Sequence, residues 1–140
     1  MAAYVTVSEA DDYFETHLAH SFWDSLSADE KLRALTTATR RIDAQWLVGE
    51  RYDEGQDLAF PRTMDGDEVP ERVKDACCEE ALFLLEGRAE AVERGVQSVR
   101  AGDASETYSA EALRSASRHG LSSTAKRLLF LWLKKSVPMR

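Results

Sequence analysis

Few side chains in this sequence have the type and spacing that catalysis or metal binding requires. The histidines His17, His20 and His119 are not placed at ligand spacing from the adjacent cysteines Cys77 and Cys78. Neither H-E-x-x-H nor C-x-x-C occurs, so the usual spacings of a zinc site are missing. The sequence also has no Gly-rich phosphate loop before a helix and no local Ser-His-Asp signature. It therefore predicts no enzyme, no metal site and no cofactor.

The remaining groups that could do chemistry have simpler interpretations. Asp65, Asp67 and Glu68 could gather a cation, but the other positions of a calcium loop are missing, which predicts a solvated acidic turn. Neighbours on a helix point in different directions, so the two cysteines are expected as buried thiols rather than as a disulfide. His17 falls on the apolar face of a predicted helix, which favours a core histidine over a metal ligand.

The elements that position these residues are predicted to form a mainly α fold, a bundle of four to five helices with a small β-hairpin. The first helix should follow Ser8 as its N-cap, and the second should open with a capping box of Ser27 and Glu30. Gly49 is expected to end the second helix, and Pro70 to occupy the first turn of the third.

Apolar spacing predicts the buried faces of these helices. In chain order the faces comprise Ala10, Tyr13, Phe14, His17 and Leu18; Leu32, Leu35, Thr39, Ile42 and Trp46; and Val73, Ala76, Cys77, Ala81, Leu84 and Leu85. A break is expected at residues 19–26. The third helix should end by Gly87 or, after a kink, at Gly95. Alternation in residues 96–100 and 104–108 predicts the hairpin. A last helical region should start near Ser109, break at Gly120 and resume at Ser122 or Ser123.

Composition and charge limit the architecture and its partners. With 140 residues, 44% of them hydrophobic, the chain should form one domain over residues 1–140. Its apolar runs are too short to span a bilayer and its N-terminus lacks a signal pattern, which predicts a cytosolic protein without membrane contact. Seven basic residues and no acidic ones follow Glu111, so residues 1–113 hold 11 Lys and Arg against 25 Asp and Glu, a net charge of −14. This asymmetry indicates two different partners or a head-to-tail contact.

A long acidic loop between the second and third helices contains one apolar cluster. The predicted anchors of this loop are Leu58, Phe60, Pro61 and Arg62. Because large apolar side chains gain nothing from exposure to water, they should pack against either their own domain or a neighbouring subunit. Packing within the domain is favoured for Phe60, since aromatic anchors usually fill the nearest core. The Arg62 guanidinium is expected to face a carboxylate near Asp53 or Asp65.

The segment from about Leu121 to Arg140 predicts a C-terminal helix that is basic and apolar on nearly every face. Its expected interface residues are Lys126, Arg127, Leu129, Trp132, Leu133, Lys134, Lys135 and Arg140. A helix that is apolar nearly all round is buried on several sides. A contact with another subunit or partner and completion of the monomer core both remain open. Binding to a membrane surface is disfavoured because the polar face is narrow and the rest of the chain is acidic.

Several motifs follow one another in a recognisable order over roughly residues 4–110. They are Tyr4-Val5-Thr6-Val7-Ser8-Glu9-Ala10, Ala38-Thr39-Arg40-Arg41-Ile42-Asp43, Gln56-x-Leu58-x-Phe60-Pro61-Arg62, a helix opened by Val69-Pro70, and Val96-x-Ser98-Val99-x-x-Gly102. This ordered set resembles the head–tail connector (adaptor) proteins of long-tailed bacteriophages, a group often labelled DnaT-like single-stranded-DNA-binding proteins. Position 60 departs from the pattern, because Trp commonly precedes the Pro-Arg pair and Phe stands here.

The resemblance implies a structural virion protein, made in the cytoplasm of the host bacterium and located in the neck of the virion. It implies a ring of identical subunits, dodecameric like the portal, that lies between the portal protein and the stopper or tail and extends the DNA channel. DNA would pass through this channel without specific binding.

Two other functions are alternatives. One is an accessory single-stranded-DNA-binding or replication protein. The sequence disfavours it, because its aromatic residues fall mostly at core positions and its pI is about 5.0. The other is a small regulatory interaction module unrelated to virions.

Overall fold

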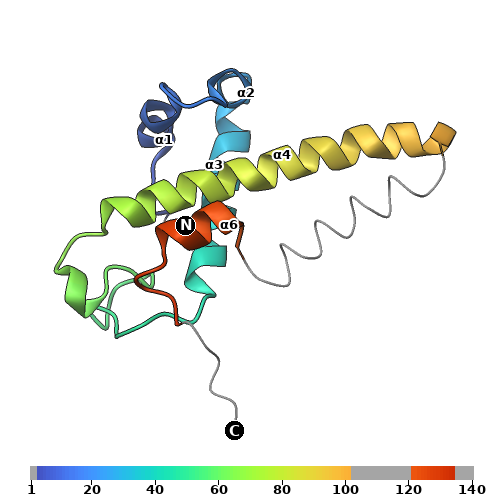
Figure 1. Cartoon of the computed structure of the whole chain (residues 1–140). Coiled ribbons are helices and arrows are strands. Elements are labelled where there is room, and N and C mark those ends of the chain that lie inside the picture. The colour runs from blue at the N-terminus through green and yellow to red at the C-terminus, as the bar shows by residue number, and fades with distance from the viewer. Residues whose placement is uncertain (1–2, 102–120, 135–140) are drawn as a thin grey trace, which may run out of the picture.

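The computed structural model describes residues 3–101 and 121–134, and within residues 90–101 it describes the backbone alone. The described residues are mainly helical. The helices are α1 (Val7–Phe14), α2 (His20–Asp24), α3 (Ala28–Asp43), the 3-10 turn η1 (Thr63–Asp65), α4 (Glu71–Ala101) and α6 (Ser123–Leu128). Figure 1 shows α4 crossing α3, with α1 and α2 at one end of α3 and the 44–70 loop at the other. The short helix α6 lies beside α4 and packs against it.

Helix α1 begins and ends earlier than the sequence predicts. Its N-cap is Thr6 and not Ser8, because Thr6 and Glu9 complete a capping box. Three residues after Ser8 stands Asp11, whose side chain is shorter than the Glu or Gln that a capping box uses. The helix ends at Phe14, which is fully buried, whereas Leu18 lies beyond the helix and is fully exposed. The turn that follows is held by His17, whose Nδ1 accepts a hydrogen bond from the backbone N–H of Ala19 at 2.9 Å.

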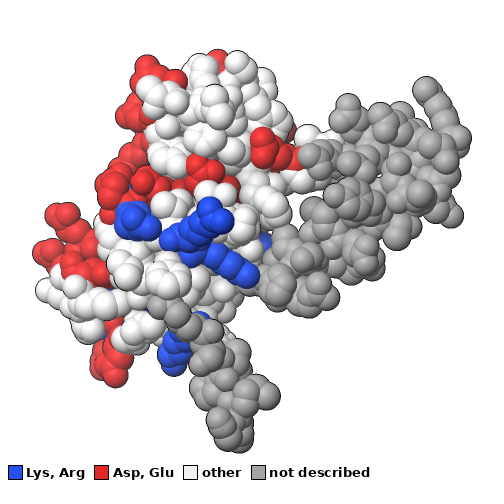
Figure 2. Space-filling view, in the orientation of Figure 1, with Lys and Arg blue, Asp and Glu red and all other residues white. Residues whose placement is uncertain are grey.

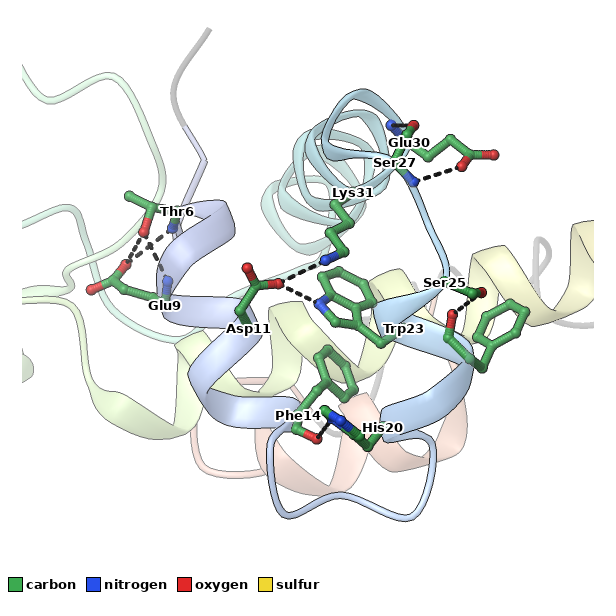
Figure 3. A network of polar contacts seen from close by, with 11 residues as sticks. Thr6, Glu9, Asp11, Phe14, His20, Trp23, Ser25, Ser27, Glu30 and Lys31 are labelled. Atoms are coloured by element: carbon green, nitrogen blue, oxygen red, sulfur yellow. Dashed lines mark hydrogen bonds and ion pairs between the residues drawn. The ribbon is translucent and has the colours of Figure 1, made fainter.

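Residues 19–26, predicted as a break, contain the short helix α2. Its Trp23 is buried and stacks on Phe14, with ring centroids 4.4 Å apart. The carboxylate of Asp11 accepts hydrogen bonds from Trp23 Nε1 at 2.8 Å and from Lys31 Nζ at 3.0 Å. One carboxylate of α1 thereby ties α2 and α3 together (Figure 3).

Helix α3 confirms its predicted start and corrects its predicted end. The capping box of Ser27 and Glu30 is present. Of the predicted apolar face, Leu35, Thr39 and Ile42 are buried, but Leu32 and Trp46 are exposed. The helix ends at Asp43, with Ala44 as its C-cap. The carboxylate of Asp43 accepts a hydrogen bond from the Tyr4 hydroxyl and another from the backbone N–H of Ala59 at 3.2 Å. The loop therefore starts before Trp46, and Gly49 lies within it.

The predicted β-hairpin is wrong in its first strand. Residues 96–100 belong to α4, which runs through Gly87 and Gly95 to Ala101; residues 104–108 lie outside the described part of the chain. Five alternating residues are a weak strand signal, whereas residues 88–101 are rich in Ala, Arg and Glu, which favour helix. A glycine in a helix costs only about 1 kcal/mol relative to alanine, so two of them do not end this one. The described residues contain isolated β-bridges but no sheet.

The core lies between α3, α4 and α6, with the N-terminal residues, α1, α2 and the 44–70 loop packed around them. Cys77 and Cys78 are buried free thiols, as predicted, and burial raises the pKa of Cys77 to about 11. Val73, Ala76 and Ala81 are also buried, as the α4 pattern predicts. Among the described helices, none combines the length and apolar character needed to cross a membrane.

Candidate functional site

The predicted loop anchors pack inside the chain. Phe60 is 2% exposed and lies edge-on to two rings, with centroids 5.9 Å from Tyr4 and 5.8 Å from Trp132. Its backbone N–H donates to the Tyr4 hydroxyl at 3.1 Å. Leu58 is half-buried against the same core. The carbonyl of Pro61 accepts hydrogen bonds from the Tyr52 N–H at 2.9 Å and from the Gln56 side-chain amide at 3.0 Å.

Arg62 holds the loop in a way that the sequence did not predict. Its guanidinium is buried and donates to the backbone carbonyls of Val48 at 3.2 Å, of Ala59 at 3.0 Å and of Gly49. The expected carboxylate partner is therefore replaced by carbonyl groups. Asp65 instead accepts a hydrogen bond from the backbone N–H of Arg62 at 2.8 Å. A chain folded back on itself brings several carbonyls to one point, and a forked guanidinium can bind them together.

Side chains of α4 form hydrogen bonds with both ends of helix α6. At its N-terminus Glu80, fully buried, accepts a hydrogen bond from the Ser122 N–H at 2.9 Å and pairs with Arg41 Nε at 2.7 Å. At its C-terminus Arg72 donates to the carbonyls of Leu128 at 3.2 Å and of Arg127 at 3.4 Å. An anion at the N-terminus and a cation at the C-terminus of a helix both complement its dipole.

The predicted long C-terminal helix ends early, at Leu128, and the chain then turns into a β-bridge. Leu133 pairs with Leu47, and the flanking hydrogen bonds run from the Val48 N–H to the Trp132 carbonyl at 2.7 Å and from the Lys134 N–H to the Trp46 carbonyl at 2.9 Å. The indole of Trp132 donates to Asp65 at 2.9 Å. Through Asp65, which also accepts from the Arg62 N–H, this segment is joined to the loop that Arg62 holds.

The predicted interface residues of the C-terminal segment divide into three groups. Leu129 and Trp132 are buried within the described chain and complete its core, and Leu133 is half-buried. Arg127 and Lys134 are exposed and Lys126 is half-buried. Lys135 and Arg140 lie outside the described residues.

The loop and the C-terminal segment expose large hydrophobic side chains that the sequence did not predict. The structure exposes eight large hydrophobic side chains in its described part, and six of them stand on the loop and the C-terminal segment: Trp46, Val48, Tyr52, Met64, Phe130 and Leu131. The cations Arg51, Arg127 and Lys134 lie on the same segments, and the carboxylates Glu50, Asp53 and Glu54 lie next to Arg51 and Tyr52 in the loop. The run Trp46-Leu47-Val48 was a usable signal, because three consecutive apolar residues cannot all face one core.

Charge is unevenly distributed over the surface. Figure 2 shows Lys and Arg gathered around α6, with Asp and Glu along α1 and the 50–68 loop. Several cations of the acidic body are engaged internally: Lys31 with Asp11, Arg41 with Glu80, Arg62 and Arg72 with carbonyls, and Lys74 with Glu9.

A pocket of about 350 Å³ lies between α1 and α4, with Glu9, Asp12, Glu71 and Asp75 in its lining. Burial, with the nearby carboxylates of Glu71 and Glu79, raises the pKa of Asp75. Beside it Glu79 accepts hydrogen bonds from the Tyr13 hydroxyl at 2.5 Å and from His17 Nε2 at 2.9 Å. Among the described residues no group of His, Cys, Asp and Glu is arranged to hold a metal ion.

Fold and surface together define a small α-helical protein whose loop and C-terminal segment close on one core and leave aromatic side chains exposed. A family model described as "Putative DnaT-like ssDNA binding protein" matches residues 1–137. The chain belongs to this family. No curated protein and no solved structure matches it.

Proposed function

We propose that this protein is a head–tail connector subunit of a bacteriophage virion, one of a ring of identical subunits between the portal protein and the stopper or tail. The observation that carries the proposal is the division of the surface into an acidic body and a basic, apolar segment around α6. A ring closed by head-to-tail contacts needs two unlike, complementary faces on every subunit. The division supports such a pair of faces.

The acidic body suits a channel for DNA. Affinity for DNA comes mostly from Lys and Arg that neutralise phosphates, and several cations of the body are held in internal contacts. With a formal net charge of −7, the chain should repel a passing polynucleotide rather than retain it. The resemblance to the adaptor proteins adds a dodecameric ring and the neck of the virion as parts of the proposal.

The second candidate is a protein that binds single-stranded DNA, and the description of the family agrees with this candidate rather than with the connector. A specific observation also favours it. Trp46, Tyr52 and Phe130 are exposed on segments that carry Arg51, Arg127 and Lys134. Exposed aromatics beside cations form the stacking platforms of single-strand binders. The low pI, about 5.0, argues against tight binding.

One pair of measurements distinguishes the candidates. Fluorescence anisotropy with a labelled oligothymidine, at about 50 and about 200 mM salt, tests for binding that weakens steeply with salt. Sedimentation velocity, alone and with the portal protein encoded by the same phage or prophage, tests for ring assembly. The connector predicts association with the portal and no micromolar binding of the oligonucleotide. Tight, salt-dependent binding without portal association would establish the second candidate instead.

A further inference from the structure

The imidazole of His17 has a hydrogen-bond partner at each ring nitrogen. The backbone nitrogen of Ala19 lies 2.9 Å from Nδ1, and Oε2 of Glu79 on α4 lies 2.9 Å from Nε2. A backbone N–H can only donate, so Nδ1 must accept with its lone pair. The proton of the neutral ring therefore lies on Nε2 and is donated to the Glu79 carboxylate.

Other titratable groups from α1 and α4 surround this contact. Tyr13 of α1 donates to the same Oε2 of Glu79 at 2.5 Å. Burial, together with this hydrogen bond, raises the pKa of Tyr13, so its hydroxyl keeps its proton. Asp75 and Cys78 of α4 lie close enough to act on the Tyr13 hydroxyl, and burial raises the pKa of Cys78, so the thiol stays neutral. The imidazole is thus bordered by one hydrogen-bonded carboxylate and by groups that keep their protons, with Asp75 as a second acid nearby.

The turn between α1 and α2 is closed by backbone bonds and by this ring. The N–H groups of His17 and His20 donate to the carbonyls of Phe14 and His17, both at 3.1 Å. Ala19 is the N-cap of α2, and its side chain makes no capping hydrogen bond. The exposed ring of His20 lies 3.3 Å from the same Phe14 carbonyl. Through Ala19 and Glu79, the imidazole of His17 joins the turn to α4.

We propose that His17 is a pH-sensitive switch in the α1–α2 turn: the neutral imidazole holds the turn, and the imidazolium releases it. Protonation adds a hydrogen to Nδ1, so two N–H groups would face each other across 2.9 Å. The bond to Ala19 must then break, whereas the bond to Glu79 becomes an ion pair and keeps the ring on α4. Leu18, which lies between the two bonded residues and is fully exposed, would change position with the turn.

The switch goes beyond the proposed function, because none of its groups lies on the 44–70 loop or on α6. Histidine is the side chain whose charge ordinarily changes between about pH 5 and pH 8. The position of the α1–α2 turn should therefore respond to pH in a range where the backbone bonds of the helices are unaffected.

Nuclear magnetic resonance of the isotope-labelled full chain tests the switch. At about pH 8 the shifts of the ring nitrogens should show a proton on Nε2 of His17 and none on Nδ1. As His17 gains its second proton, the protection of the Ala19 amide against solvent exchange should fall about fivefold, the factor that one hydrogen bond of ordinary strength represents. Protection is taken relative to an unstructured peptide at the same pH. The amide of Ile42, in the core of α3, should keep its protection.

Three variants connect this response to His17. His17→Asn keeps an oxygen that can accept from the N–H two residues later and cannot gain a proton, so Ala19 should stay protected at both ends of the pH range. His17→Leu removes the acceptor and should leave Ala19 equally unprotected at both. His20→Gln, at the exposed histidine of the same turn, is the matched control and should keep the wild-type response. Circular dichroism checks that all three variants are folded.

Three results for the wild type would each overturn the inference: a proton on Nδ1 at about pH 8, a ring that stays neutral down to about pH 5, or Ala19 protection that does not follow the titration of His17. A His17→Asn variant that retains the pH response would overturn it as well.

Discussion

The Oε1 atom of Glu80 lies 2.9 Å from the backbone nitrogen of Ser122. A fully buried carboxylate on α4 thus accepts a hydrogen bond from the residue just before α6. The other oxygen pairs with Arg41 of α3, so this side chain joins the two long described helices to the C-terminal segment. Its burial is tolerated because both oxygens have partners.

Glu80→Ala should destabilise the protein by about 3 kcal/mol, because it removes the buried carboxylate that pairs with Arg41 Nε and accepts from the Ser122 N–H. Glu80→Gln should cost less, since the amide oxygen can still accept from Ser122. Urea denaturation followed by circular dichroism measures both. Glu54→Ala, at an exposed position of the 44–70 loop, is the matched control and should stay within about 0.5 kcal/mol of the wild type. Equal stability of Glu80→Ala and the control would contradict the role given to this carboxylate.

Two tryptophans provide a matched comparison of core and surface. Trp132 is 6% exposed, contacts Phe60 and donates to Asp65, so Trp132→Ala should cost about 3–5 kcal/mol. Trp46 is 54% exposed, and Trp46→Ala should change stability by less than about 1 kcal/mol. Thermal unfolding monitored by circular dichroism compares the two. The reverse order of stabilities would place the C-terminal segment outside the core.

Arg62→Lys should destabilise the loop although it keeps the charge. A lysine ammonium is a point charge and cannot repeat a fork that binds the carbonyls of Val48, Gly49 and Ala59. The bond to Ala59 is buried, and leaving a buried carbonyl without a donor costs about 1–3 kcal/mol. Chemical denaturation measures the change, and the exposed neighbour Arg51→Lys serves as the control. Hydrogen exchange should also quicken at the Tyr52 and Thr63 amides, which bond across the loop.

Asp75→Asn should stabilise the protein at neutral pH. Burial and the carboxylates of Glu71 and Glu79 raise the pKa of Asp75, and Arg72 offsets only part of this. A carboxyl whose pKa is higher in the folded chain favours folding when protonated, and this contribution is lost as the pH rises through the folded pKa. The charged form therefore costs stability at pH 7, by roughly 0.5–1 kcal/mol for two like-charge pairs at i,i+4.

The gain from Asp75→Asn should shrink as the pH falls and vanish below about pH 4, where the wild-type carboxyl is protonated as well. Denaturation midpoints at a series of pH values test this, with Asp67→Asn on the exposed loop as the control. A gain that is independent of pH would mean that charge is not its cause.

Much of the helical architecture could be predicted, because local signals determine it. The capping box at Ser27 and Glu30, the buried positions Leu35, Thr39 and Ile42, and the start of α4 after Pro70 all follow from spacing within one helix. The end of α3 could not be predicted in this way. Just beyond it, residues 46–48 bond with the C-terminal segment at residues 132–134, and no pattern within the helix encodes that contact.

The sequence indicated which residues of the loop would make contacts, but it did not indicate most of their partners. Phe60 was expected to pack within its own domain and does so. The partners of Arg62 and the exposure of Trp46 depend on how the loop folds back, and no local pattern encodes that path. The early end of α6 likewise results from Arg72 and the bridge at Leu47, both far away in sequence.

The position of segment 121–134 in the core affects how the chain is made. This segment leaves the ribosome after every other described residue, yet Phe60 and Glu80 need Trp132 and Ser122 to complete their surroundings. A nascent chain that has not reached this point holds an incomplete core and cannot take up its final fold. Folding therefore requires synthesis through residue 134. Chains that are interrupted before that point should be degraded by proteases and should not assemble.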